Sequence, residues 1–169
     1  DVRNVDIVSE KLPTAFNGYR IVQFSDLHTG TWGNDTAFVS KLVDSINALR
    51  PDVIMFTGDI VNRKTCELEP FRKVLKRLKA KDGVYSVLGN HDYGDYVDWS
   101  SSRSKADNLR QLKDWQGDMG WKLLNNSYEF IKRGSDSIAI IGVENWGEPP
   151  FGQYGDLVKA YRGKGVGLN

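Results

Sequence analysis

Short apolar runs that alternate with helical patterns are the feature that most restricts the fold of this chain. Three runs rich in β-branched and aromatic residues have the length of strands, and they cover residues 19–25, 53–57 and 83–88. Between them, residues 35–49 and 70–80 place apolar side chains at the spacing of a helix face. Strands that alternate with helices pair in parallel through right-handed crossovers, so an α/β fold that begins with a βαβαβ unit is predicted.

The remaining sequence continues the same layered domain. A third helix is expected over residues 105–116, and strands are expected over residues 121–124, 128–132 and 138–142. A further helix is expected to start within residues 156–160. With 169 residues the chain has room for one domain with a substantial core.

Composition excludes several classes of function. The net charge is +1, so no general electrostatic attraction to nucleic acid is expected. The single cysteine, Cys66, excludes an internal disulfide, and no stretch reaches the roughly 18 consecutive apolar residues of a membrane span. The chain begins at Asp1 without a signal-peptide pattern, which leaves open a removed signal or anchor.

Three polar clusters directly follow the three predicted strands. They are DLH, which begins at Asp26, GD, which ends at Asp59, and GNHD, which holds Asn90 and His91. Successive clusters are about one βαβ unit apart, so they are expected to lie side by side at the carboxyl edge of a parallel sheet. Open α/β sheets bind their ligands at that edge. The glycines that precede Asp59 and Asn90 permit sharp turns and close backbone approach.

The residue types in these clusters suit a divalent metal ion. Asp26 and His28 are two positions apart, so a continued strand would turn both side chains to the same face. The Asp59 carboxylate has two oxygens and could bridge two ions, and Asn90 adds a neutral amide oxygen. Such ligands suit borderline ions such as manganese, iron(II) or zinc. Taken singly, Asp26 and Asp59 would also fit ordinary turn or capping roles, but the joint pattern favours a metal site.

In this order and spacing, DLH, GD and GNHD resemble the calcineurin-like metallophosphoesterase superfamily. The stretch LPTAFNGYRIVQFSDLH is similar to a bacterial branch that includes membrane-associated phosphodiesterases and lipid-A-precursor pyrophosphatases. The resemblance implies a two-sheet sandwich flanked by helices. It also implies hydrolysis of a phosphodiester, phosphomonoester or pyrophosphate by a hydroxide that two metal ions generate.

The resemblance further implies a role for each motif residue. Asp26 and His28 would bind the first metal, Asp59 would bridge both metals, and Asn90 would bind the second. His91 would not be a ligand.

On the same resemblance, His91 would face the substrate beside Asn90. It would stabilise charge on the phosphorus and protonate the leaving oxygen, and Asp92 would orient its ring. These assignments make His91 and Asp92 the expected catalytic pair.

Five aromatic residues fall in loops near the motifs. For Trp32, Tyr93 and Trp99 two interpretations stay open, because they would either grip the non-phosphate part of a substrate or cap the core. Trp32 and Tyr93 are the expected substrate contacts under the first interpretation. For Tyr96 and Trp146, packing is favoured.

The superfamily pattern also includes a later histidine and a Gly-His-x-His motif, which complete both metal sites. This sequence has two histidines, His28 and His91, so these ligands are absent from it. The first metal would keep Asp26, His28 and Asp59, whereas the second would keep only Asp59 and Asn90. We therefore expect this chain to bind at most one ion and to hydrolyse its substrate weakly.

The chain is accordingly interpreted as the N-terminal portion of one metallophosphoesterase domain over residues 1–169, without the C-terminal metal-ligand region. It ends in the Gly-rich residues 163–169 without a closing element. The second sheet would be incomplete, and an open edge invites self-association. A phosphate ester is the expected partner. The branch resemblance suggests a bacterial, membrane-associated or extracytoplasmic location with the signal or anchor removed, and the compartment stays open.

Two alternatives remain open. Some members of the superfamily have lost their metals and serve as non-catalytic scaffolds, although the filled ligand positions here argue against that role for the complete protein. The basic residues on and around the second predicted helix, from Arg63 to Lys81, would either attract an anionic lipid or substrate or form a solvated face. The solvated face is favoured.

Overall fold

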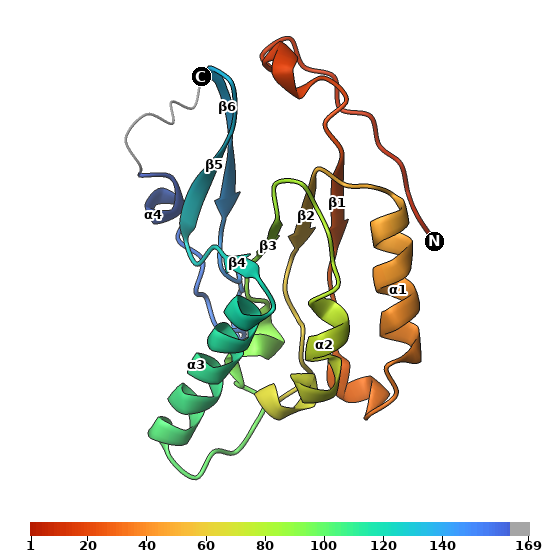
Figure 1. Ribbon diagram of the computed structural model, residues 1–169. Helices are drawn as coiled ribbons and strands as arrows, with labels where there is room; N and C mark the ends of the chain where they lie inside the picture. The colour runs from red at the N-terminus through yellow and green to blue at the C-terminus, as the bar shows by residue number, and fades with distance from the viewer. Residues whose placement is uncertain (163–169) are drawn as a thin grey trace.

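Four short parallel strands form the central sheet in the computed structural model, which describes residues 1–162 (Figure 1). The strands are β1 (Ile21–Phe24), β2 (Val53–Phe56), β3 (Val84–Ser86) and β4 (Trp121–Leu123), and they pair in this order. All three pairings are parallel, which confirms the predicted βαβαβ unit and adds β4 to it.

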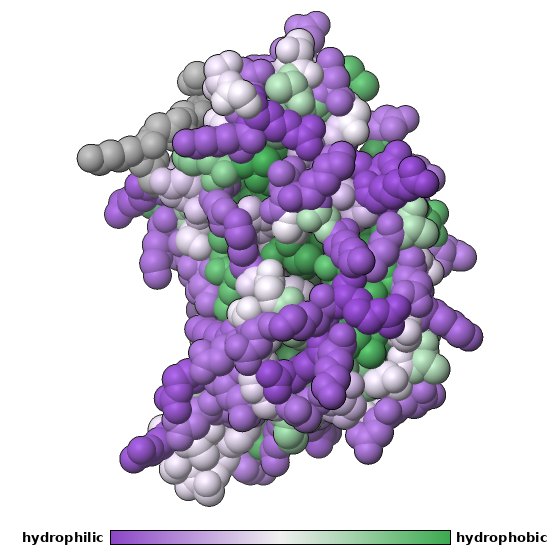
Figure 2. Space-filling view, in the orientation of Figure 1, coloured by the Kyte–Doolittle hydropathy of each residue, from purple (hydrophilic) through white to green (hydrophobic). Residues whose placement is uncertain are grey.

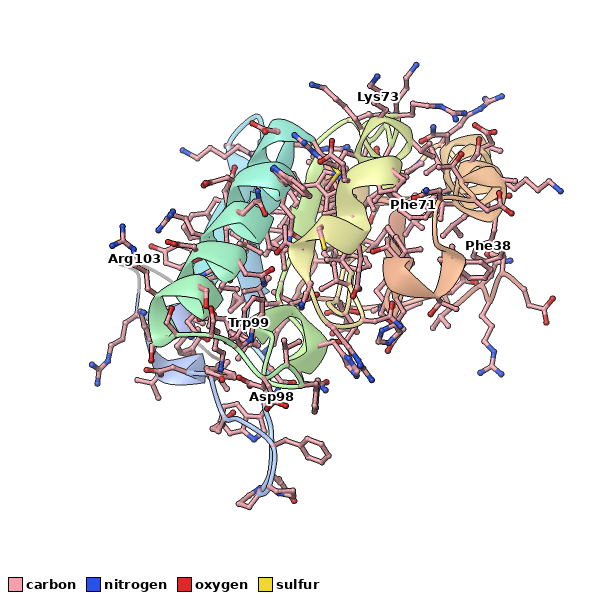
Figure 3. The ribbon with its side chains drawn as sticks, turned by 90° about the horizontal axis from the view of Figure 1, so that it is seen from below. Phe38, Phe71, Lys73, Asp98, Trp99 and Arg103 are labelled. Carbon is pink, nitrogen blue, oxygen red and sulfur yellow. The ribbon has the colours of Figure 1, made fainter. Side chains whose placement is uncertain are left out.

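Three helices lie side by side along one face of this sheet (Figure 1). They are α1 (Ala37–Ala48), α2 (Arg72–Leu75) and α3 (Ser102–Asp118). The strands pair in the order in which they occur in the chain. With right-handed crossovers, every helix that connects two of them therefore lies over the same face of the sheet. The main core fills the space between the helices and the sheet, and its buried members include Val43, Ile54, Phe56, Leu75 and Leu112. In the view from below, Lys73 and Arg103 point outward from this layer, while Phe71 is fully buried (Figure 3).

An antiparallel hairpin covers the opposite face of the sheet. Its strands β5 (Ser127–Arg133) and β6 (Asp136–Gly142) form the second sheet, which has two strands within the described residues. A second core lies beneath it, made of Phe16, Val53, Tyr85, Leu124, Ile131 and Ile140. The Arg133 side chain ties the hairpin to the sheet, because Nη2 donates to Asp52 Oδ1 at 3.0 Å.

The second helix is shorter than its apolar pattern predicts. Residues Thr65–Phe71 form a 3₁₀ helix and only Arg72–Leu75 are α-helical, so the predicted helix over residues 70–80 is wrong beyond its first turns. The cause is Asn47 on α1, whose amide donates to the Arg77 carbonyl at 2.9 Å and accepts from the Lys79 N–H at 2.8 Å. A side chain that captures these backbone groups replaces the bonds that would continue the helix.

Side chains accept from backbone N–H groups at the starts of two other helices. The Asp35 carboxylate, one residue before the Thr36 N-cap of α1, accepts from the Ala37 N–H at 2.8 Å. At α3 the Ser101 hydroxyl accepts from the Ser104 N–H at 3.1 Å, so the helix begins three residues before the predicted start. The last described helix, α4 (Leu157–Tyr161), lies where a helix was expected, and the Gly-rich residues 163–169 fall outside the described part of the chain.

The surface around α2 helps to decide between the two interpretations of its basic residues. Figure 2 shows hydrophilic residues over most of this face, with apolar atoms between them. Arg72 pairs with Glu69 and Asp118, and Arg77 pairs with Asp44. This pairing supports the solvated face over an anion-binding surface. In the described part of the chain, no helix combines the length and the apolar character needed to cross a membrane.

Candidate metal centre

The loops that follow β1 and β2 are joined by backbone hydrogen bonds. The Asp26 N–H donates to the Gly58 carbonyl at 3.0 Å, and the His28 N–H donates to the Asp59 carbonyl at 3.0 Å. Asp26, His28 and Asp59 all adopt the left-handed conformation, with φ of 55°, 43° and 61°. This conformation is uncommon for residues other than glycine, and it is maintained here by the bonds between the loops.

The expectation that a continued strand turns the Asp26 and His28 side chains to the same face is wrong. The strand ends at Phe24, so continued strand geometry does not turn the two side chains to one face. They nevertheless converge, with Asp26 Oδ1 3.8 Å from His28 Nε2. The turn, and not the pleat of a strand, brings the carboxylate and the imidazole together.

Two glycines let the loops after β2 and β3 touch. A Cβ on Gly58 would lie 2.4 Å from the Gly89 nitrogen, and a Cβ on Gly89 would lie 2.3 Å from Asp59 Oδ1. No side chain fits in either place, and Gly58 also has a φ of 100°. The close backbone approach predicted for these glycines is therefore confirmed.

His28, Asp59 and His91 meet at this edge of the sheet. Each offers one ligand atom, and these atoms lie within 4.8 Å of one another. The two imidazole rings are edge to face, with centroids 4.7 Å apart. The Asp59 Oδ1 atom accepts from the His91 N–H at 2.9 Å, which fixes the carboxylate against the third loop. His91, which was not expected as a ligand, is thus within reach of the same ion as His28 and Asp59.

This donor set fits a divalent metal ion. Imidazole nitrogen and carboxylate oxygen are ligands of manganese, iron and zinc. Asp26, a predicted ligand, is not among the three residues that converge, although its Oδ1 lies 3.8 Å from His28 Nε2. The Nδ1 atom of His28 is buried and has no hydrogen-bond partner among the described residues. Buried polar atoms are usually satisfied by protein, water or an ion, so this ring has capacity for a further ligand.

The His91 ring is oriented by a backbone carbonyl. Its Nδ1 atom lies 2.8 Å from the Asn62 oxygen. A carbonyl can only accept, so Nδ1 carries a proton and Nε2 remains available to a substrate or an ion. The expectation that Asp92 orients this ring is wrong, because the bonds that the Asp92 carboxylate accepts come from backbone N–H groups.

Asp92 instead joins the loops after β2 and β3. Its fully buried carboxylate accepts from the N–H groups of Asp59 and Ile60 at 2.9 Å each and of Gly89 at 3.0 Å. Burial raises the pKa of Asp92 to about 7, the backbone donors oppose this rise, and the nearby Asp59 charge adds to it. One buried side chain therefore sets the backbone around two of the motif loops.

Asn90 is positioned by a tyrosine that was expected to pack. Its Nδ2 atom donates to the Tyr96 hydroxyl oxygen at 2.6 Å, which leaves the amide oxygen available as a ligand. Tyr96 is 40% exposed, and its ring centroid lies 4.7 Å from that of His91. Packing is therefore the wrong interpretation for Tyr96.

The other loop aromatics divide between packing and exposure. Tyr93 is buried, and its hydroxyl donates to Glu144 at 3.0 Å. Trp32 is half-buried against the core, and its indole N–H donates to the Leu27 carbonyl at 3.1 Å. For Trp32 and Tyr93, these contacts favour core packing over contact with a substrate. Trp146 is 64% exposed, so the packing expected for it is wrong.

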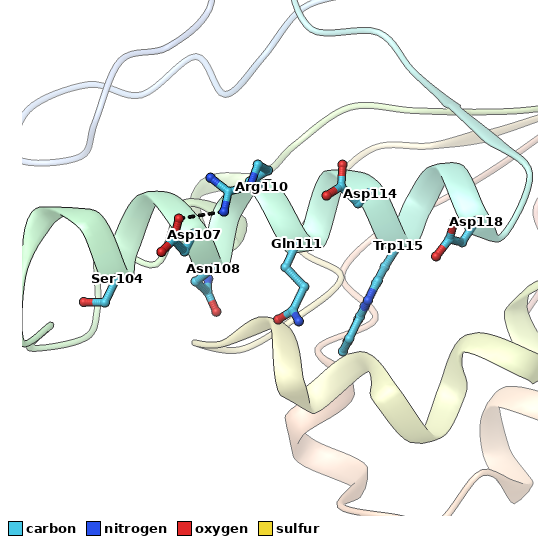
Figure 4. Close-up of a pocket in the computed structure, with 8 residues that line it drawn as sticks. All are labelled: Ser104, Asp107, Asn108, Arg110, Gln111, Asp114, Trp115 and Asp118. Atoms are coloured by element: carbon cyan, nitrogen blue, oxygen red, sulfur yellow. Dashed lines mark hydrogen bonds and ion pairs between the residues drawn. The ribbon is translucent and has the colours of Figure 1, made fainter.

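A shallow pocket on α3 lies apart from the motif loops (Figure 4). Its lining residues are Ser104, Asp107, Asn108, Arg110, Gln111, Asp114, Trp115 and Asp118. Asp107 pairs with Arg110, and none of the motif residues contributes to this pocket. We assign it no part in the metal centre.

Comparison with known proteins agrees with this geometry. The family model of the calcineurin-like phosphoesterases matches residues 19–158. A transmembrane protein with a metallophosphoesterase domain from Danio rerio is 31% identical over 150 residues, which are 85% of this chain and 31% of that protein. The UDP-2,3-diacylglucosamine pyrophosphatase LpxG of Chlamydia trachomatis is 44% identical over 90 residues, which are 51% of this chain and 27% of that protein.

A third relative is an uncharacterized metallophosphoesterase of Bacillus subtilis, YkuE, which is 35% identical over 92 residues, 53% of this chain and 32% of that protein. The chain thus spans less than a third of the length of these three relatives. The match of the family model covers most of the chain and contains every motif described above. The chain therefore belongs to the calcineurin-like phosphoesterase family, as the sequence motifs predicted.

Proposed function

We propose that this protein hydrolyses phosphate esters with the help of a divalent metal ion at the carboxyl edge of its parallel sheet. The observation that carries the proposal is the meeting of His28, Asp59 and His91 within 4.8 Å, in a chain of the calcineurin-like phosphoesterase family. Three loops that are distant in sequence converge there, and the sheet edge is open to solvent on the Asp26 side.

In this proposal Asp26, His28 and Asp59 hold the ion, and the Asn90 amide oxygen adds a ligand beside them. Manganese, iron or zinc fits this set equally. Such an ion, when bound, supplies Lewis-acid polarisation of phosphate oxygens and activation of water. Because the chain has two histidines, the residues present support one ion better than two, and we propose weak hydrolysis for this chain by itself.

His91 is the proposed proton donor to the leaving oxygen. Its Nδ1 proton is directed at the Asn62 carbonyl, so the ring presents Nε2 to the centre in a fixed orientation. A second proton on Nε2 makes the ring an acid that stabilises negative charge on the phosphate and then protonates the leaving group. The Asp59 carboxylate, 2.9 Å from the His91 N–H, holds the backbone of this residue in place.

The relatives bear on the substrate and on the location. LpxG is named as a pyrophosphatase of UDP-2,3-diacylglucosamine, and the Danio rerio protein is named as a transmembrane protein. The first name supports a pyrophosphate as the substrate, and the second supports a location near a membrane. We further propose that the two-stranded hairpin sheet offers an edge for self-association.

Metal content and hydrolysis of bis(4-nitrophenyl) phosphate test the proposal. We expect the chain to bind about one equivalent of manganese or zinc and to release nitrophenol. Asp59→Asn should lose the metal and at least about a hundredfold in kcat. The exposed Asp98→Asn serves as the matched control and should change neither.

His91→Ala separates two roles for this residue. If His91 acts only as an acid, the variant keeps the metal and loses activity, whereas a ligand role also lowers the metal content. A chain that binds no metal and shows no hydrolysis, with Asp59→Asn indistinguishable from it, would contradict the proposal and favour the scaffold alternative.

A further inference from the structure

The loop after β6 carries two large aromatic side chains that the core does not bury. Trp146 is 64% exposed and Phe151 is 54% exposed. Neighbouring exposed aromatic rings expose apolar area to water, and such patches often mark binding sites. Here they lie beside Asn90, in a pocket of about 240 Å³ lined by Asn90, Asn145, Trp146, Gly147, Glu148 and Phe151.

The loop is fixed to the segment that carries Asn90. The Tyr93 hydroxyl donates to Glu144 at 3.0 Å, and the Tyr154 hydroxyl donates to Asp95 at 2.8 Å. The Tyr93 and Tyr154 rings stack with centroids 3.7 Å apart. These contacts hold both ends of the loop against the motif segment, so the position of the pocket relative to Asn90 is set by the fold.

The loop is also braced internally. The Asn145 amide donates to the Gly152 carbonyl at 3.0 Å, and the Phe151 N–H donates to the Glu148 carbonyl at 2.8 Å. A Cβ on Gly147 would lie 2.4 Å from the Gly152 oxygen, so the two arms of the loop are in direct contact. Because the loop is already ordered, binding a ligand to its aromatic rings costs less conformational entropy than binding to a flexible loop would.

The lining residues select the chemistry of the ligand. Two aromatic rings favour a flat apolar group that can stack on them. Glu148 is the one charged residue among those that line the pocket, and no cationic side chain accompanies it. A second anionic group on the ligand would be repelled there.

We propose that Trp146 and Phe151 bind the organic group esterified to the phosphate, and that this group is an uncharged aromatic ring system. This inference rests on the proposed function, because the phosphate must occupy the adjacent metal centre. An aryl ring and a nucleobase share the required flat face, and both are within the proposal.

Two phosphonates that are not hydrolysed test the subsite apart from catalysis. Phenylphosphonate and methylphosphonate offer the same anion and differ in the ring, and their affinities for the manganese-loaded chain are measured by calorimetry. We expect phenylphosphonate to bind about tenfold more tightly, as one stacking contact gives. Trp146→Ala should abolish this preference without changing the affinity for methylphosphonate, and Trp146→Phe should restore much of it.

Further probes define the class of ring. 4-Phosphonobenzoate, which adds a negative charge to the ring, should bind more weakly than phenylphosphonate, and Glu148→Gln should remove that difference. Adenosine 5′-phosphate against ribose 5-phosphate distinguishes a nucleobase from a simple aryl ring as the preferred occupant.

The outcomes separate the two proposals. Equal affinity for phenylphosphonate and methylphosphonate in the wild-type chain, or an unchanged preference in Trp146→Ala, overturns the subsite and leaves the metal centre intact. Failure of every phosphonate to bind the manganese-loaded chain overturns the proposed function and the subsite together.

Discussion

The carboxyl edge of the parallel sheet and the β5–β6 hairpin differ in how their backbones are stabilised. The hairpin pairs seven residues with seven in an uninterrupted antiparallel register, from Ser127 opposite Gly142 to Arg133 opposite Asp136. The sheet edge has strands of three or four residues, followed by loops in which Asp26, His28 and Asp59 are left-handed. All four predicted metal ligands lie in the second region, and none lies in the first.

The candidate site lies where regular strand pairing ends. Between the two strands of the hairpin, the backbone groups that face the partner strand are satisfied by regular pairing. The loops must find other partners, and they do so through one another and through the buried Asp92 carboxylate. The cost of the unusual conformations is offset by tertiary bonds that also bring the candidate ligands together.

The largest expected effect follows from replacing the buried Asp92 carboxyl group that joins the loops. Asp92→Asn places an amide where three or more backbone N–H groups point at a carboxylate, so we expect a loss of about 3 kcal/mol in the free energy of unfolding. Urea denaturation measures this loss, and manganese titration should show weakened binding as well. Asp98→Asn, on the exposed surface of the same segment, is the control, and a loss as large there would contradict a specific role for Asp92.

An intermediate effect concerns the attachment of the hairpin to the sheet. Burial by itself would raise the pKa of Asp52, but bonds from Lys81, the Arg20 backbone and Arg133 outweigh it and lower the pKa to about 2. Because the folded value lies below the unfolded value, Asp52 adds stability at neutral pH that is lost as the pH falls from about 4 to about 2.

The corresponding variant is Asp52→Asn. It should lose about 2 kcal/mol of unfolding free energy at pH 7 and little at pH 2, as urea denaturation at the two pH values would show. The metal centre lies at the other end of the strands, so the manganese affinity should stay unchanged. The exposed Asp114→Asn is the control, and an equal loss at both pH values would contradict the charge-based explanation.

The smallest expected effect concerns the Tyr96 hydroxyl beside Asn90. Tyr96→Phe removes the oxygen that accepts from Asn90, so the amide is free to turn and we expect the metal affinity to fall about fivefold. The matched variant on the hairpin, Tyr128→Phe, should leave the affinity unchanged. Calorimetric titration with manganese compares the two, and equal affinities would mean that Tyr96 does not position Asn90.

A central strand of the sheet could be predicted closely because β2 is apolar on both faces. The β2 run has no polar residue at its centre, and the observed Val53–Phe56 differs by one residue from the expected 53–57. The helix around α2 could not be predicted, because the Asn47 side chain that stops it belongs to a different helix. Periodicity predicts which face of a helix is buried, whereas the residue at which this helix ends depends on a tertiary contact.

In the candidate site too, some features could be predicted from the sequence and others could not. The motifs identified Asp26, His28, Asp59, Asn90 and His91 from residue type and spacing, and the structure places them at one edge. The partners that orient them could not be identified in this way. A backbone carbonyl such as that of Asn62 leaves no mark in a sequence, and a tyrosine six residues after Asn90 looks like any loop aromatic.

The contact between Gly58 and Gly89 also constrains how this sequence can diverge. Each glycine is adjacent to the backbone or ligand of the other loop, so a side chain gained at one position cannot be accommodated by a change at the second. Contacting residues often change together through compensating substitutions, but no such pair of substitutions is possible at Gly58 and Gly89. They should therefore persist in any descendant that keeps these two loops in contact, whether or not it binds a metal ion.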